Sequence, residues 1–295
     1  MIPWMLAVVA LSLAVIALGI GWWGAGIILH PPKMSALAVF PEQFGLAYEK
    51  VSFQTSDGLT LKGWFLPSPT GDGRTLLMCH GWGDNKGELL SGTHFLNSAC
   101  GFNLLYFDNR SHGESGGDIT TIGCLEVMDF HAAMAFLRSQ KPQCLERLGV
   151  FGLSMGAAVA AMAVPAHPEV KAVVMESPFT TYRQVTRRWA WNNLRIPYFP
   201  LMMIVLWMLR LRVGREDVDE YSPIRFISRV APRPVLFISG AEDRLMPPSD
   251  VRALFSAARE PKELWLIPGA SHGKCRELAG TDYDRRITEF FARTL

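Results

Sequence analysis

The sequence predicts an α/β protein in which a mostly parallel sheet is flanked by helices and preceded by one long apolar helix. Short apolar segments typical of buried strands alternate with segments of helical spacing, which favours a parallel sheet covered on both faces. The first 32 of the 295 residues contain no Asp, Glu, Lys or Arg, although 19% of the whole chain is charged. At residues 148–162 a strand pattern leads through a single serine directly into a helix pattern.

The N-terminal segment predicts a membrane anchor. Residues 2–29 are almost continuously apolar, and a helix of this length crosses the ~30 Å hydrocarbon layer of a bilayer. Trp4 near one end and Trp22 and Trp23 near the other are typical of membrane interfaces. A cleaved signal peptide is the alternative, but it has a basic start and an apolar stretch of only ~7–15 residues. We therefore predict a single-pass transmembrane helix over residues 1–30.

The number and position of the charged residues bear on the partners and the orientation of the chain. The net charge of +2 gives no strong field that would favour nucleic acid as a partner. Lys33 and Lys50, on the C-terminal side of the apolar helix, favour a cytoplasmic position for the remainder of the chain. Residues 31–46 are expected to form a linker, of which 33–46 could instead be an interfacial segment, and residues 47–295 are long enough for one large domain.

The elements of this domain are predicted from the apolar spacing. Two alternating segments, 47–54 and 59–66, surround a Ser-Asp-Gly turn and predict an antiparallel hairpin at the sheet edge. The further strands are expected at residues 75–79, 102–107, 148–152, 172–175, 235–239 and 263–267, and the helices at 86–99, 124–138, 157–162, 249–258 and 283–294.

One segment, about residues 179–222, does not fit this alternation. It contains seven arginines and no acidic residue before Glu216, and its part 196–209 is uncharged and rich in Met, Leu and aromatic residues. Fourteen residues are too few to span a bilayer, so this part predicts a buried or interfacial helix. We expect a helical cap over the carboxyl edge of the sheet, although the apolar part could simply pack on the domain while the arginines are solvated.

The strand-serine-helix segment contains Gly152-x-Ser154-x-Gly156. A serine in such a turn is held in a strained conformation that exposes its hydroxyl, and the glycines let strand and helix pass closely. A second Gly-x-Ser-x-Gly occurs around Ser115, but no helix pattern comes after it and no strand leads directly into it. Ser154 is therefore the expected nucleophile.

A serine nucleophile needs a base, and the base needs an orienting acid. In this type of turn the acid and then the histidine follow the serine along the chain. His167 lies at the end of the helix after Ser154 and cannot fold back, so His272, in the loop after a strand, is the expected base. Asp243 directly follows another strand and is the expected acid, with Glu176 as the alternative.

The oxyanion of an acyl-transfer intermediate requires N–H groups that already point at it. One is expected from Met155, at the start of the helix, and the other from Trp82 in the loop His80-Gly81-Trp82-Gly83. His80 is expected to be a buried histidine that bonds the backbone rather than a base.

Five motifs occur in a fixed order along the chain: His80-Gly81-Trp82-Gly83, Asp108-x-Arg110-Ser111-His112-Gly113-x-Ser115, Gly152-x-Ser154-x-Gly156, Asp243 and His272. Together they resemble the α/β-hydrolase superfamily. They are most similar to its membrane-anchored BEM46 and ABHD-like branch, near the serine aminopeptidase and monoacylglycerol lipase-type sequences.

The resemblance covers about residues 47–295 and implies an α/β-hydrolase fold with a cap. It implies Ser154 as nucleophile, His272 as base and Asp243 as orienting acid. Ser111 stands where glycine is common in the family, so its loop is expected to differ in shape.

From these residues we predict a membrane-anchored serine hydrolase that cleaves an ester or thioester of a lipid-like acyl substrate, with no metal or organic cofactor and no nucleic-acid partner. An aminopeptidase or amidase on the same triad is the alternative. Acidic residues that could bind a substrate amine are available for it: Glu176, Glu216, Asp217, Asp219 and Glu220. A non-catalytic scaffold would be expected to have lost a triad residue or a glycine of the serine turn, and none is lost.

Overall fold

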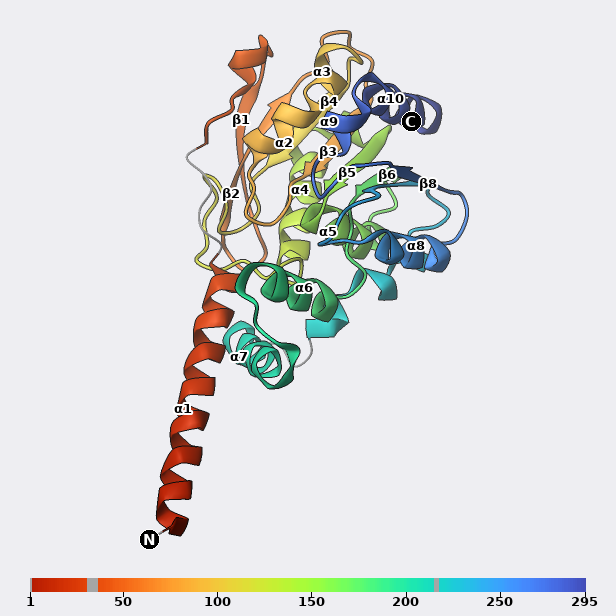
Figure 1. Ribbon diagram of the computed structural model, residues 1–295. Helices are drawn as coiled ribbons and strands as arrows, with labels where there is room; N and C mark the ends of the chain where they lie inside the picture. The colour runs from red at the N-terminus through yellow and green to blue at the C-terminus, as the bar shows by residue number, and fades with distance from the viewer. Residues whose placement is uncertain (1, 31–36, 215–217) are drawn as a thin grey trace.

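The computed structural model describes residues 2–30, 37–214 and 218–295 and is built around one eight-stranded sheet (Figure 1). The strands are β1 (Glu49–Gln54), β2 (Thr60–Leu66), β3 (Thr75–Cys79), β4 (Asn103–Phe107), β5 (Leu148–Leu153), β6 (Val170–Glu176), β7 (Val235–Gly240) and β8 (Lys262–Ile267). Their order is β1-β2-β4-β3-β5-β6-β7-β8. The hairpin β1–β2 is antiparallel and lies at one edge, and the strands from β4 to β8 are parallel. The predicted α/β-hydrolase architecture is confirmed.

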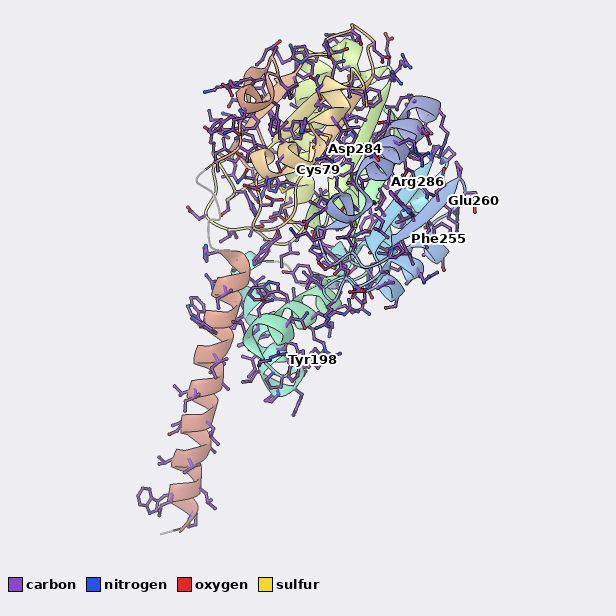
Figure 2. All side chains as sticks on the ribbon, turned by 45° about the horizontal axis from the view of Figure 1, so that its top comes forward. Cys79, Tyr198, Phe255, Glu260, Asp284 and Arg286 are labelled. Atoms are coloured by element: carbon purple, nitrogen blue, oxygen red, sulfur yellow. The ribbon has the colours of Figure 1, made fainter. Side chains whose placement is uncertain are left out.

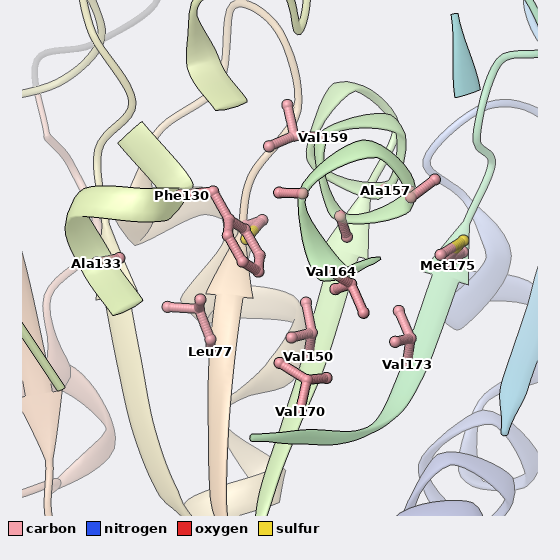
Figure 3. Close-up of a cluster of buried hydrophobic side chains, with 14 of the residues drawn as sticks. Leu77, Phe130, Ala133, Val150, Ala157, Val159, Val164, Val170, Val173 and Met175 are labelled. Carbon is pink, nitrogen blue, oxygen red and sulfur yellow. The ribbon is translucent and has the colours of Figure 1, made fainter. Parts of the chain in front are cut away.

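Helices cover both faces of the sheet (Figure 1). One face is covered by α4 (Glu126–Gln140), α5 (Met155–Ala163) and α8 (Pro248–Ala257), and the other by α2 (Lys86–Thr93), α3 (Phe95–Ser98), α9 (Cys275–Ala279) and α10 (Thr281–Thr294). Figure 3 shows the first of these interfaces, where Phe130 of α4 faces Leu77 of β3 and Ala157 of α5 points toward Met175 of β6. The parallel strands are buried on both faces, which explains their continuously apolar sequences.

The prediction of one helix over residues 86–99 is wrong in one respect, because the structure divides this segment into α2 and α3. The hydroxyl of Thr93 donates a 2.6 Å hydrogen bond to the carbonyl oxygen of Leu89. Side-chain bonds of this kind compete with the helical ladder and bend helices.

The cap differs from its prediction in a similar way. It consists of α6 (Tyr182–Leu194), a π-helical turn (Tyr198–Met202) and α7 (Met203–Val213), and α6 meets the second half at an angle of 116°. The helix expected at 196–209 therefore begins later, because Pro197 and Pro200 restrict the backbone before it. Figure 2 labels Tyr198 in this part of the cap. Residues 215–217 at the end of the expected cap lie outside the described residues.

The N-terminal helix α1 (Ile2–Leu29) extends away from the other elements over most of its length (Figure 1). Residues Pro3–Leu29 are long and apolar enough to cross a membrane, a property that a signal sequence shares. Most side chains along the helix are exposed, including Trp4, Trp22 and Trp23. Its last two turns contact the domain, and α7 packs beside it.

Part of the predicted linker is packed on the domain. Phe40, Phe44 and Leu46 lie against the core on the α10 side of the sheet, around a short 3-10 helix (Pro41–Phe44). Burial of these aromatic rings gives this segment a fixed path along the domain. The first six linker residues, 31–36, lie outside the described residues.

Candidate active site

The turn between β5 and α5 has the geometry expected for a serine nucleophile. Ser154 adopts φ 54° and ψ −113°, which is strained for a residue with a side chain. A Cβ atom on Gly152 would lie 2.6 Å from the Cα of Ala157, and one on Gly156 would lie 2.1 Å from the carbonyl oxygen of Cys79. Gly152 therefore lets β5 and α5 pass each other closely, and Gly156 lets α5 pass the end of β3.

His272 lies between this serine and a buried carboxylate. Its Nε2 is 3.1 Å from Ser154 Oγ, and its Nδ1 is 2.7 Å from Asp243 Oδ2. The second oxygen of Asp243 accepts the N–H groups of Leu245 (2.9 Å) and Met246 (2.8 Å). These two N–H groups hold the Asp243 carboxylate in place, so that it keeps the proton of His272 on Nδ1. Nε2 is then free to accept a hydrogen bond from the serine hydroxyl.

The loops after β7 and β8 bring this acid and base together. A Cβ atom on Gly240 would lie 2.1 Å from the carbonyl oxygen of Ala270, so the two loops touch at a position without a side chain. The N–H of Glu242 donates to the same carbonyl at 2.9 Å. The side chain of Glu242 is exposed, as expected, while that of Asp243 is inaccessible.

Two backbone N–H groups are available for an oxyanion. Met155 is the first residue of α5. Trp82 follows Gly81, and Gly81 lies beside the nucleophile, because a Cβ atom added to Gly81 would lie 3.5 Å from the Cβ of Ser154. Within the described residues neither N–H has an acceptor in the protein. The positive end of α5 adds a favourable field at the same place.

Two buried histidines fix the loop that carries Trp82. His80 accepts the N–H of Asn109 at Nε2 (2.9 Å), so Nδ1 carries its proton and donates to the carbonyl of Gly81 (2.7 Å). His112 accepts the N–H of Gly83 at Nε2 (3.0 Å). Burial lowers the pKa of both imidazoles, that of His80 far below its usual value. Both remain neutral and hold the loop, as expected for His80.

The Asp108–Ser115 motif braces the same region. Asp108 forms a fully buried ion pair with Lys86, and Arg110 pairs with Asp129. Ser115, in the second Gly-x-Ser-x-Gly, donates its hydroxyl to the carbonyl of Asp108 (2.6 Å).

Ser111 of this motif lies in a backbone conformation that glycine favours. Ser111 has φ 60°, in the left-handed region where a side chain is strained. Its N–H donates to the carbonyl of Gly116 at 2.9 Å. The loop thus makes a left-handed turn at Ser111, and the expected difference in shape from other family members stays a prediction.

Glu176, the alternative acid, is engaged elsewhere. Its carboxylate accepts the hydroxyl of Tyr283 on α10, and its backbone carbonyl accepts the N–H of Ser154 (2.8 Å). Burial raises the pKa of Glu176 and that of Tyr283. No local pattern in the sequence indicates this pair, because the two residues are far apart along the chain and come together only when α10 packs on the sheet.

Two cavities of different character meet at Ser154 and His272. The larger, about 480 Å³, has the charged residues Asp84, Glu176 and Arg276 in its lining. Burial raises the pKa of Asp84 to about 7. The smaller, about 250 Å³, is lined almost entirely by apolar side chains from the cap, the loops after β3, β6 and β7, and α1. A substrate bound at Ser154 would thus have one polar and one apolar side.

No cluster of three or more potential metal ligands occurs in residues 2–30, 37–214 and 218–295. Of the five free cysteines, four are buried, and Cys100 is partly exposed.

Comparison with known proteins identifies the family. The family described as serine aminopeptidase S33 matches residues 72–230, more than half of the chain. The chain belongs to the serine aminopeptidase S33 family. It is 29% identical to YqkD of Bacillus subtilis, over 97% of this chain and 96% of that protein. It is 27% identical to the protein Bem46 of Schizosaccharomyces pombe, over 96% of this chain and 91% of that protein. The S33 chain is thus an α/β-hydrolase of the BEM46-like branch.

Solved structures of other proteins share the fold. The esterase Pf2001 of Pyrococcus furiosus superposes with a TM-score of 0.75 at 24% identity, over 90% of this chain and 98% of that one. An acylaminoacyl peptidase of Pyrococcus horikoshii gives a TM-score of 0.60 at 20% identity, over 85% of this chain and 42% of that one. At these identities the likeness establishes the fold.

Proposed function

We propose that this S33-family chain is a membrane-anchored serine hydrolase that cleaves carboxylic esters or thioesters of lipid-like acyl groups through an acyl-enzyme on Ser154. The observation that carries the proposal is the contact series from Ser154 Oγ through His272 to Asp243, at 3.1 and 2.7 Å.

The chemistry is that of this contact series. Ser154 Oγ attacks the carbonyl carbon while its proton passes to His272 Nε2, and the oxyanion is stabilised by the N–H groups of Trp82 and Met155. His272 then gives the proton to the leaving oxygen or sulfur, and the bond from that atom to the acyl carbon breaks. Water, deprotonated by His272, attacks the acyl-enzyme in the same way and releases the acid and Ser154.

The apolar cavity supports an acyl chain rather than a charged amino terminus as the bound group. Its lining residues in the described ranges include no Asp or Glu. Of the acidic residues that could serve an aminopeptidase, Glu176 bonds Tyr283, Asp219 pairs with Arg183 and Glu220 is exposed. The remaining two, Glu216 and Asp217, lie outside the described residues.

The aminopeptidase alternative rests on the family description and on the carboxylates of the polar cavity. Asp84 and Glu88 line that cavity, and neither has an ion-pair partner among the described residues. The ammonium group at the amino terminus of a peptide could be bound there. Peptide amides therefore belong in the substrate panel.

The cap and α1 support a membrane-resident substrate. Arg187, Arg195 and Arg210 are exposed and have no carboxylate partner in the described part of the chain, so they are available to anionic lipid headgroups. Trp191 and Trp207 on the same segment are about half exposed, as is typical of residues at a membrane interface. Basic residues on the C-terminal side of α1 favour the cytoplasmic side for the catalytic domain.

A substrate panel tests this function. Full-length protein in detergent micelles is expected to hydrolyse p-nitrophenyl esters with kcat/KM rising from acetate to decanoate by up to about fourfold per methylene, because each buried CH₂ contributes ~0.8 kcal/mol. Vesicles containing phosphatidylglycerol should raise the rate above that in phosphatidylcholine vesicles, and Ser154→Ala should be inactive.

Two outcomes would contradict the proposal. If kcat/KM did not change with acyl chain length, or were highest for short chains, a lipid-like substrate would be contradicted. Faster cleavage of amino-acid p-nitroanilides than of esters would favour the aminopeptidase.

A further inference from the structure

The last two turns of α1 are built into the catalytic half of the molecule. Ala25, Ile28 and Leu29 are 0–2% exposed, whereas most of the preceding helix is exposed. They belong to a hydrophobic cluster that also contains residues of the cap and of the loops around Ser154. A tether that only held the domain at a membrane would not require this burial.

A close contact between α1 and α7 holds this end of the helix in place. A Cβ atom on Gly21 would lie 2.5 Å from Ile204 Cγ2, and one on Gly24 would lie 2.9 Å from Val205 Cγ2. Gly21 and Ala25 are four residues apart on one face, a spacing of small residues that lets two helix backbones approach. The cap is thus packed on α1 as well as on the sheet.

Hydrogen bonds join the end of α1 to the loops of the site. The carbonyl groups at a helix C-terminus lack partners within the helix. The carbonyl of Ile28 accepts the indole N–H of Trp82 at 3.3 Å, and that of Leu29 accepts the backbone N–H of Thr120 at 2.9 Å. Trp82 is the residue whose backbone N–H is expected to face the oxyanion, so α1 is bonded directly to the oxyanion loop.

The side chain of Ile28 lines the 250 Å³ apolar cavity. Ser154, Met155 and His272 line the same cavity, and the cap contributes Val185 and Trp189. Ile28 is the contribution of α1 to a wall that begins at the reacting hydroxyl. Its size therefore limits how much apolar material can be held beside Ser154.

From these contacts we propose that the end of α1 is a wall of the acyl-binding pocket, and that Ile28 determines the length of acyl chain accepted. The inference rests on the proposed ester hydrolysis at Ser154 and deepens it by naming a specificity residue. The helix that would enter the membrane then also shapes the site, so a straight acyl chain is held between α1 and the cap.

Substitutions of opposite size test this role in the full-length protein. Ile28→Ala enlarges the cavity and is expected to raise the ratio of kcat/KM for p-nitrophenyl laurate over butyrate at least fivefold. Ile28→Phe fills the cavity and should lower that ratio at least fivefold. Leu29→Ala is the matched control, because its side chain is equally buried but does not line the cavity, and its ratio should stay within twofold of wild type.

The outcomes separate this inference from the function on which it rests. Reaction of each variant with short- and long-alkyl fluorophosphonates provides a second measurement that needs no turnover, and the same shifts are expected. Wild-type ratios in both folded Ile28 variants, in a chain that hydrolyses esters, would overturn the inference alone. A wild-type chain that neither hydrolyses esters nor reacts with fluorophosphonate would overturn the proposed function and this inference with it.

Discussion

At the scale of single residues, Asp243 shows how few groups set the chemistry of the site. One of its oxygens faces His272 Nδ1, and the other accepts the N–H groups of Leu245 and Met246. An asparagine at this position would keep its carbonyl oxygen on those two donors. Its amide group would then donate to Nδ1, and the imidazole would carry its proton on Nε2, where it could not accept from Ser154.

Asp243→Asn is accordingly expected to lower kcat for ester hydrolysis by about 10³–10⁴-fold with little change in thermal unfolding temperature. Steady-state kinetics with p-nitrophenyl butyrate measure the effect. The exposed neighbour provides the control, and Glu242→Gln should keep kcat within twofold. If Asp243→Asn retained more than a tenth of the wild-type kcat, another group would have to orient His272.

Chain order and position at strand ends are enough to select the three residues that the structure brings together, Ser154, Asp243 and His272. Long-range partners cannot be selected in this way. Asp250 of α8 is 5% exposed and pairs with Arg188 of the cap. No local pattern indicates a contact between residues so far apart along the chain.

At the scale of elements, α4 and His167, which follows the short 3-10 helix after α5, share a polar cluster. Arg138 donates to His167 Nδ1 at 2.8 Å, so His167 carries its proton on Nε2 and donates to His131 Nδ1 at 2.7 Å. Burial, followed by the neighbouring charges of His131 and Arg138, lowers the pKa of His167 to about 4. Between these two pKa values His167 is therefore neutral in the folded chain, whereas in the unfolded chain its side chain, with a pKa of ~6.5, is protonated.

The sign of the pH effect is set by this difference. Between pH ~6.5 and about 4 the unfolded state binds the additional proton, so the free energy of unfolding falls as the pH falls, by at most ~1.4 kcal/mol per pH unit. His167→Gln is expected to reduce this slope, and urea unfolding followed by tryptophan fluorescence at pH 7.5, 6.5 and 5.5 measures it. Buried Asp129, whose pKa is raised to about 6, acts in the opposite direction, so the comparison is made between variant and wild type. Equal slopes would contradict this role of the cluster.

The strands and helices can be predicted because the spacing of apolar residues within each segment is enough to indicate its secondary structure. The misplaced boundaries lie where a second local effect competes with that period. Thr93 bonds back to Leu89 and divides α2 from α3, and Pro197 and Pro200 delay the start of α7.

At the scale of the whole molecule, the sequence predicts a separate anchor, a linker and a domain, whereas the structure packs the end of α1 against the cap and the domain. A uniformly apolar helix has the same composition whether a face meets lipid or protein, so hydropathy cannot reveal the packed face. The small residues Gly21, Gly24 and Ala25 are the available signal for it. Phe40 and Phe44 likewise indicate that part of the linker is packed.

The proposed chemistry requires that the hydroxyl of Ser154 be the group that is acylated, and covalent labelling tests this most directly. Full-length protein is treated with a fluorophosphonate, digested and analysed by mass spectrometry. We predict modification of the peptide that contains Ser154, its loss in Ser154→Ala and its retention in Ser115→Ala, which alters the other Gly-x-Ser-x-Gly. Absence of labelling in the folded wild type, or labelling that persists in Ser154→Ala, would contradict acylation at Ser154.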